Sequence, residues 1–129
     1  MFPSHDPMGA VNFNSHQMKH LFSCYRHYNC TLILSMQYGS QIPTYIRSMS
    51  SHVCLFKSRM KLQLTSCYES YGFLFNTFDD FVKRVNQCTE KKYHYMYINM
   101  NQESDDVNTM YKTKKCPSIP NKRIKFYKL

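Results

Sequence analysis

The sequence predicts a mixed α/β domain in which a parallel-type sheet is flanked by helices. Short apolar runs at residues 31–36, 53–56 and 93–99 suit buried strands, and they alternate with segments that have helical spacing of apolar residues. Apolar residues make up 43% of the 129-residue chain, enough for one domain with a modest core. Alternation of strands and helices is typical of parallel sheets, since each helix returns the chain to the same end of the sheet.

The first helix is expected after a proline-bearing lead-in at residues 1–13, with Asn14 or Ser15 as its cap and an end near Tyr28. Its apolar side chains recur at helical spacing: Met18, Leu21, Phe22 and Tyr25. One face of this helix should therefore be buried. The first strand, at residues 31–36, follows it directly.

A short helix is expected at residues 43–49, because a proline near the first turn loses no hydrogen bond there. The second strand follows at residues 53–56. Residues 57–67 suit a helix and a strand equally well. A helix at 77–88 is the clearest element, with Thr77 as N-cap and two aspartates in its first turn. The third strand, at residues 93–99, completes the set.

Polar residues flank the first apolar run and suggest a site. Gln37 stands at the exit of that run, where side chains of a parallel sheet reach a ligand, and a glutamine there suits a phosphate or an attacking water. Arg26 precedes the run, and Arg47 follows in the loop toward the same edge. Simpler interpretations are a polar strand end for Gln37, a helix-dipole partner for Arg26 and a surface charge for Arg47.

These motifs occur in a definite order: Arg26 with His27, an apolar strand ending in Gln37, an Ile46-Arg47 pair and a second apolar strand. This order resembles the FtsK/HerA superfamily of DNA-pumping ATPases, and most closely the genome-packaging ATPases of poxvirus-like viruses and Polinton-type elements. The resemblance covers about residues 14–100. It implies the C-terminal part of a P-loop, RecA-like core, with Gln37 sensing the γ-phosphate and Arg26, ahead of Arg47, acting as an arginine finger.

The elements that would hold ATP and Mg²⁺ are missing. None of the three glycines belongs to a phosphate-binding Gly-Lys-Ser/Thr loop, and no apolar strand ending in acidic residues precedes Arg26. The chain alone is therefore expected to lack ATP hydrolysis and to bind no cofactor. The resemblance implies a fragment or degenerate relative of a viral motor that moves double-stranded DNA into capsids during virion assembly. Its partners would be a Walker-bearing N-terminal half and neighbouring subunits of a homo-oligomeric ring.

The composition changes near residue 105, which ends the ATPase-like domain expected over residues 14–104. The last 23 residues contain no acid, and the chain carries a formal net charge of +9. Cations and aromatic residues in this expected tail, residues 105–129, favour binding to nucleic-acid phosphates. The candidate contacts are Lys112, Lys114, Lys115, Lys122, Arg123 and Lys125. A tail that aids solubility or import fits the same pattern.

Two functions from other classes stay open. A small, basic, non-catalytic nucleic-acid-binding or accessory protein explains the charge without any motor. A zinc-stabilised interaction module would explain the four potential ligands that share one helical face: His16, His20, Cys24 and His27. A straight helix cannot wrap four ligands around one ion, and no Cys-x-x-Cys motif is present. We therefore expect no metal site.

The chain has neither an apolar stretch of about 20 residues nor the pattern of a signal peptide at its start. Its six cysteines have no paired spacing and are expected to be free thiols. We expect an intracellular protein, in the host cytoplasm, nucleus or viral factory or in the virion, neither secreted nor associated with a membrane.

Overall fold

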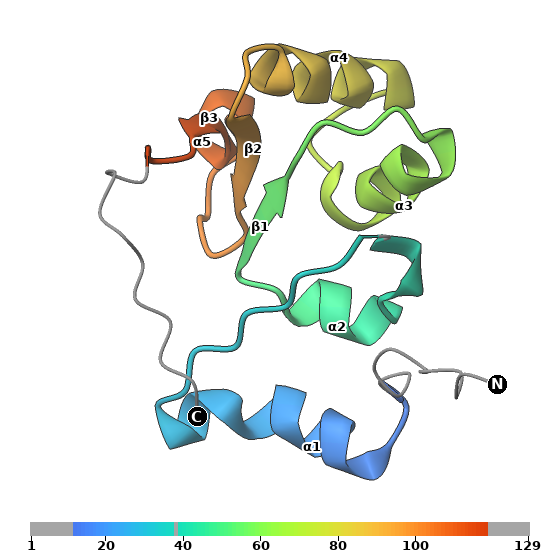
Figure 1. Cartoon of the computed structure of the whole chain (residues 1–129), viewed down its shortest axis with the longest axis vertical. Helices are drawn as coiled ribbons and strands as arrows, with labels where there is room; N and C mark the ends of the chain where they lie inside the picture. Colours follow the sequence, from blue (N-terminus) through green and yellow to red (C-terminus); the bar gives the residue numbers. More distant parts are fainter. Residues whose placement is uncertain (1–11, 38, 119–129) are drawn as a thin grey trace, which may run out of the picture.

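The computed structural model describes residues 12–37 and 39–118 (Figure 1). Figure 1 shows the sheet beside α3 and below α4, with α2 and α1 further down. The elements in chain order are α1 His16–Cys24, the 3₁₀ helices η1 Tyr25–Tyr28 and η2 Gly39–Gln41, α2 Thr44–Met49, β1 His52–Leu55, α3 Lys61–Tyr71, α4 Phe78–Thr89, β2 His94–Asn99, α5 Val107–Met110 and β3 Tyr111–Lys115.

The sheet has three strands in the order β1-β2-β3, and both pairings are antiparallel. The register places His52 opposite Asn99 and His94 opposite Lys115. The expected parallel-type sheet is therefore wrong, and a P-loop core is not supported. Two helices, α3 and α4, connect β1 to β2. A single helix between two strands returns the chain to the end of the sheet where the first strand began, so the next strand is parallel. Two helices leave the chain at the opposite end of the sheet, so the next strand runs antiparallel.

The expected strand at residues 31–36 is also wrong. The segment has no regular secondary structure and joins no ladder in the described part of the chain, and the Ile33 side chain is 87% exposed. Both edges of β2 are already taken by β1 and β3. An apolar run indicates a tendency to be buried, but it does not specify the strand with which it pairs.

The core lies between one face of the sheet and helices α3 and α4. Phe81 and Val85 of α4 pack on Met96 and Ile98 of β2, and all four side chains are buried. Cys88, Leu64, Cys67, Tyr71, Met110 and Tyr111 belong to the same cluster. Each large apolar side chain buried in this way contributes about 1.5–3 kcal/mol. The result is a two-layer arrangement in which helices cover one face of the sheet.

The clearest sequence-predicted helix is confirmed. α4 begins after Thr77, whose Oγ1 accepts a 3.2 Å hydrogen bond from the amide of Asp80. α2 is confirmed with Pro43 as its N-cap. The first helix is shorter than expected, since α1 ends at Cys24 and continues only as a 3₁₀ turn.

Residues expected as a basic tail contribute to the fold. Asp106 caps α5 by accepting hydrogen bonds from the amides of Asn108 and Thr109. β3 follows and pairs with β2, and the side chain of Tyr111 is fully buried. A high density of lysine concealed this strand, because only its first residue, Tyr111, is buried and the other four are exposed.

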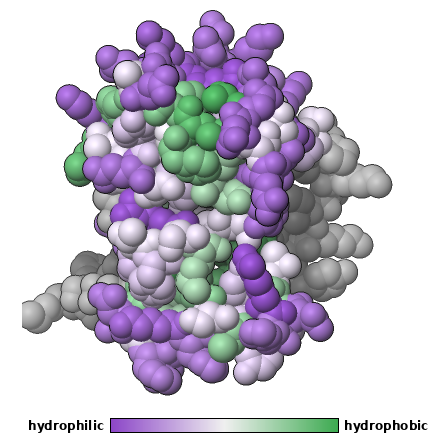
Figure 2. Space-filling model, turned by 180° about the vertical axis from the view of Figure 1, so that it is seen from behind, coloured by the Kyte–Doolittle hydropathy of each residue, from purple (hydrophilic) through white to green (hydrophobic). Residues whose placement is uncertain are grey.

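The surface carries apolar groups as well as charge. Figure 2 shows a hydrophobic patch in the upper half of the molecule, bordered by hydrophilic side chains. Large exposed apolar side chains include Leu62 and Phe73. No described helix is long and apolar enough to cross a membrane.

Candidate nucleic-acid interface

One face of the sheet is not covered by α3 or α4. Side chains alternate along a strand, so the neighbours of the buried Met96 and Ile98 point away from the core. Tyr97 stands opposite Cys54 on one side and Lys112 on the other. The residues of this open face are His52 and Cys54 of β1, Tyr95 and Tyr97 of β2, and Lys112 and Lys114 of β3, together with Phe56 just after β1.

Aromatic pairs cross between the strands of the open face. The rings of His52 and Tyr97 stack at 5.8 Å with an interplanar angle of 15°, and a 2.8 Å hydrogen bond joins the Tyr97 hydroxyl to His52 Nδ1. The rings of Phe56 and Tyr95 lie 5.4 Å apart. The Phe56 side chain is 61% exposed, so this surface offers ring area to a ligand. Cross-strand aromatic pairs also fix the positions of their rings.

Cations accompany these rings. Lys114 Nζ lies 5.8 Å from the centre of the Tyr97 ring, and Lys112 on the same strand is exposed. None of the three strands in the described residues contains an acidic residue. Within residues 12–37 and 39–118, the one ion pair joins Lys83 to Asp80 on α4. The lysines of β3 therefore have no carboxylate partner there.

The Cys54 thiol and the Tyr95 hydroxyl of the open face stay neutral near pH 7. Burial, followed by the nearby Cys116 thiol, raises the pKa of Cys54. Burial, followed by Cys54, Cys116 and Tyr97, raises the pKa of Tyr95. A thiol with a raised pKa is a poor nucleophile, because the thiolate is the reactive form. The face is therefore suited to binding and not to cysteine chemistry.

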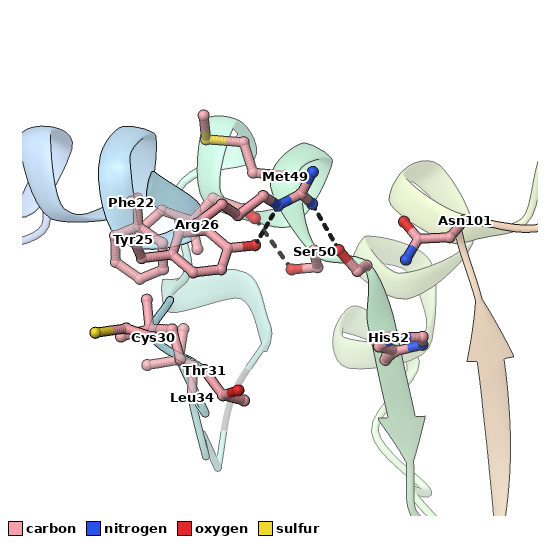
Figure 3. Close-up of a pocket in the computed structure, with 13 residues that line it drawn as sticks. Phe22, Tyr25, Arg26, Cys30, Thr31, Leu34, Met49, Ser50, His52 and Asn101 are labelled. Carbon is pink, nitrogen blue, oxygen red and sulfur yellow. Dashed lines mark hydrogen bonds between the residues drawn. The ribbon is translucent and has the colours of Figure 1, made fainter. Parts of the chain in front are cut away.

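Arg26 belongs to a second candidate site, a cavity of about 330 Å³ between η1 and β1 (Figure 3). Its Nε donates a 3.0 Å hydrogen bond to the Tyr25 hydroxyl, and its Nη2 donates one of 2.7 Å to Ser51 Oγ. The hydrogen bond from Arg26 is the main cause that lowers the pKa of Tyr25. Arg26 thus joins the 3₁₀ turn to the residue that precedes β1.

The other two expected site residues lie elsewhere. Gln37 is exposed, and its backbone carbonyl accepts a 3.3 Å hydrogen bond from Gln63 of α3. Arg47 is half-buried and bonds to Ser66 and Ser70 of the same helix. Neither Gln37 nor Arg47 is among the described residues that line the Arg26 cavity. The structure does not gather the three residues at one site.

Of the expected tail contacts, Lys112, Lys114 and Lys115 lie on β3, whereas Lys122, Arg123 and Lys125 lie outside the described residues. Sequence reasoning missed the aromatic partners of these lysines. The signal was the alternation of Tyr95 and Tyr97 with apolar residues along β2. That alternation is typical of a strand with one exposed face.

In the described part of the chain, no three His, Cys, Asp or Glu side chains gather closely enough to hold a metal ion. In the first helix, His16 and His20 stack with ring centroids 6.4 Å apart, and His20 Nδ1 lies 3.7 Å from Cys24 Sγ. The fold and the open face together define a small mixed α/β protein with a three-strand antiparallel sheet. Comparison with family models, curated proteins and solved structures finds no match to the chain.

Proposed function

We propose that this protein binds single-stranded nucleic acid on the open face of its sheet. The observation that carries the proposal is the placement of exposed and half-buried aromatic rings beside lysines without acidic partners in the described part of the chain, all on one surface. Stacking of a base on an aromatic side chain contributes about 1–3 kcal/mol, and lysines bind the phosphates. Antiparallel sheets that carry aromatic side chains on an open face are a recurring platform for RNA.

The spacing of the rings supports an unpaired strand as the ligand. Tyr95 and Tyr97 project from alternate positions of β2, about 7 Å apart along the strand. Bases in a duplex are stacked about 3.4 Å apart, so rings at twice this spacing suit bases that have been separated. Duplex bases are stacked on each other and present no free faces to these rings.

The charge pattern supports the same ligand. Lys112 and Lys114 extend from the neighbouring strand, opposite Tyr97 and Tyr95. A phosphate backbone that follows β3 would therefore lie beside bases that stack along β2. ATP hydrolysis and DNA packaging are not part of this proposal, since Gln37, Arg26 and Arg47 belong to separate places on an antiparallel scaffold.

The test is equilibrium binding of fluorescently labelled 12-nucleotide DNA and RNA strands, and of the matching duplexes, at several salt concentrations. Tyr97→Ala should weaken single-strand binding by about 5- to 160-fold because one stacking surface is lost. Tyr97→Phe keeps the ring and should bind nearly as tightly as the wild type. Lys112→Ala combined with Lys114→Ala should reduce the slope of log K against log salt by about 1.4.

Two variants away from the open face serve as controls. Lys83→Ala removes a cation from α4, and Phe73→Ala removes an exposed ring from another part of the surface. Both should retain wild-type affinity. Equal losses in the control and open-face variants, or tighter binding of duplex than of single strands, would overturn the proposal.

A further inference from the structure

We propose that the cavity at Arg26 holds a phosphate group of the nucleic-acid strand bound on the open face. This inference rests on the proposed function, and it adds a second binding site to the platform. The cavity lies between η1, the segment that follows it and the start of β1. Its volume of about 330 Å³ is at the lower end of the range for small-ligand sites, and it can accept a phosphate with its sugar.

The lining of the cavity selects an anion. Arg26 supplies a permanent positive charge, and no aspartate or glutamate is among the described lining residues. Polar side chains that can donate hydrogen bonds complete this side: Tyr25, Thr31, Ser51, His52 and Asn101. Arginine suits phosphate because its planar guanidinium donates several hydrogen bonds in a fixed direction.

Arg26 is positioned in advance of binding. Its Nε is held by Tyr25 of the same 3₁₀ turn (Figure 3), and its Nη2 is held by Ser51, the residue before β1. Its Nη1 makes no hydrogen bond within the described residues, and the side chain is exposed. A guanidinium held in this way loses little rotamer freedom when it binds an anion, so less of the binding energy is lost to ordering.

His52 connects the cavity to the open face. It lines the cavity, and it also stacks on Tyr97 and shares a hydrogen bond with it. A nucleic-acid strand whose base stacks on Tyr97 therefore passes next to the cavity, because His52 borders both. The wall formed by Leu32 and Leu34 is apolar, and it suits the carbon atoms of a sugar and not a second anion.

The experiment measures binding of the same 12-nucleotide strands to Arg26→Ala, Arg26→Lys and Ser51→Ala. Arg26→Ala should weaken binding about 10-fold and reduce the salt slope by about 0.7, the loss of one phosphate contact. Arg26→Lys should recover the slope but not the full affinity, since lysine does not match the forked geometry. Ser51→Ala keeps the charge and should lose only a few-fold. Circular dichroism and thermal melts establish that each variant is folded.

Binding of free adenosine monophosphate is measured by the shifts that it causes in the NMR signals of Ser51 and His52. This measurement distinguishes binding of a free nucleotide at the cavity from binding of a strand. Competition between this nucleotide and the strand for Arg26 supports the inference. The inference is overturned if the nucleotide binds at Arg26 while Arg26→Ala leaves strand affinity and salt slope unchanged. In that case Tyr97→Ala still decides the proposed function independently, because it alters the platform and leaves Arg26 in place.

Discussion

Arg47 Nη1 donates a 2.8 Å hydrogen bond to Ser70 Oγ and thereby joins α2 to α3 across 23 residues of sequence. The same nitrogen donates to the carbonyl oxygen of Ser66 at 3.1 Å, and Nη2 donates to Thr44 Oγ1 at 3.2 Å. Arginines that donate to several acceptors stabilise packing through both charge and geometry. The structure therefore gives Arg47 a role in holding two helices together.

Arg47→Ala should lower the free energy of unfolding by about 2–3 kcal/mol, because the hydrogen-bond acceptors of α3 lose a charged donor. Arg47→Lys should recover only part of this loss, since an ammonium group cannot reach the three acceptors together. Urea denaturation followed by circular dichroism measures both changes. Arg59→Ala, at an exposed position between β1 and α3, is the matched control and should be nearly neutral. An unchanged midpoint for Arg47→Ala would contradict this role.

Gly72 ends α3 in a space too small for a side chain. A Cβ at this position would lie 2.7 Å from the backbone carbonyl oxygen of Tyr68 and 2.3 Å from its ring. Gly72→Ala should therefore cost about 1–3 kcal/mol, as overpacking does elsewhere. Gly39→Ala is the control, since its new Cβ would meet only Cys67 Sγ at 3.9 Å. Thermal melts should show a lower midpoint for the first variant and no loss for the second.

Local sequence signals predicted individual elements better than their arrangement. The capping threonine and first-turn acids of α4 act within a few residues, so Thr77 sufficed to predict where that helix begins. Strand direction depends instead on the number of helices between strands, and the ambiguity at residues 57–67 concealed α3. The parallel sheet was inferred from that incomplete count of helices.

The sequence predicted only part of the candidate site, because the site also depends on how distant segments are arranged. Lysines at 112, 114 and 115 were recognised by composition, but their aromatic partners on β2 come from another segment and depend on strand register. Likewise, Arg26 and Gln37 flank one apolar run in the sequence, yet they contact Ser51 and Gln63 respectively. Proximity in sequence did not produce a shared site, since residues 31–36 pair with no described strand.

Tyr93 adopts a left-handed backbone conformation, with φ of 65°, in the turn between α4 and β2. Side chains other than glycine pay about 1 kcal/mol in this region because Cβ approaches the carbonyl oxygen. Tyr93→Gly should therefore be about 1 kcal/mol more stable than Tyr93→Ala. At Phe73, whose φ is not positive, the alanine variant should instead be the more stable of the corresponding pair. A more stable alanine variant at both positions in urea denaturation would show that Tyr93 is not strained.

Tyr111 should make the fold sensitive to alkaline pH. Burial raises the pKa of Tyr111 to about 12, and its hydroxyl donates a hydrogen bond to the carbonyl oxygen of Tyr71. The unfolded chain ionises at a pKa of about 10. Below pH 10 both states are protonated and the stability is fully present. Between pH 10 and 12 only the unfolded state loses its proton, so the free energy of unfolding falls as pH rises.

The comparison of wild type with Tyr111→Phe isolates this effect. The variant should be about 1 kcal/mol less stable at pH 7, because the carbonyl oxygen of Tyr71 loses its donor. It should then lose less stability than the wild type between pH 10 and 12. A smaller slope should remain, since burial also raises the pKa of Tyr71. Tyr28→Phe, at an exposed ring, should keep the wild-type slope. Identical slopes for wild type and Tyr111→Phe in urea titrations would show that this hydroxyl is not protected from ionisation by the fold.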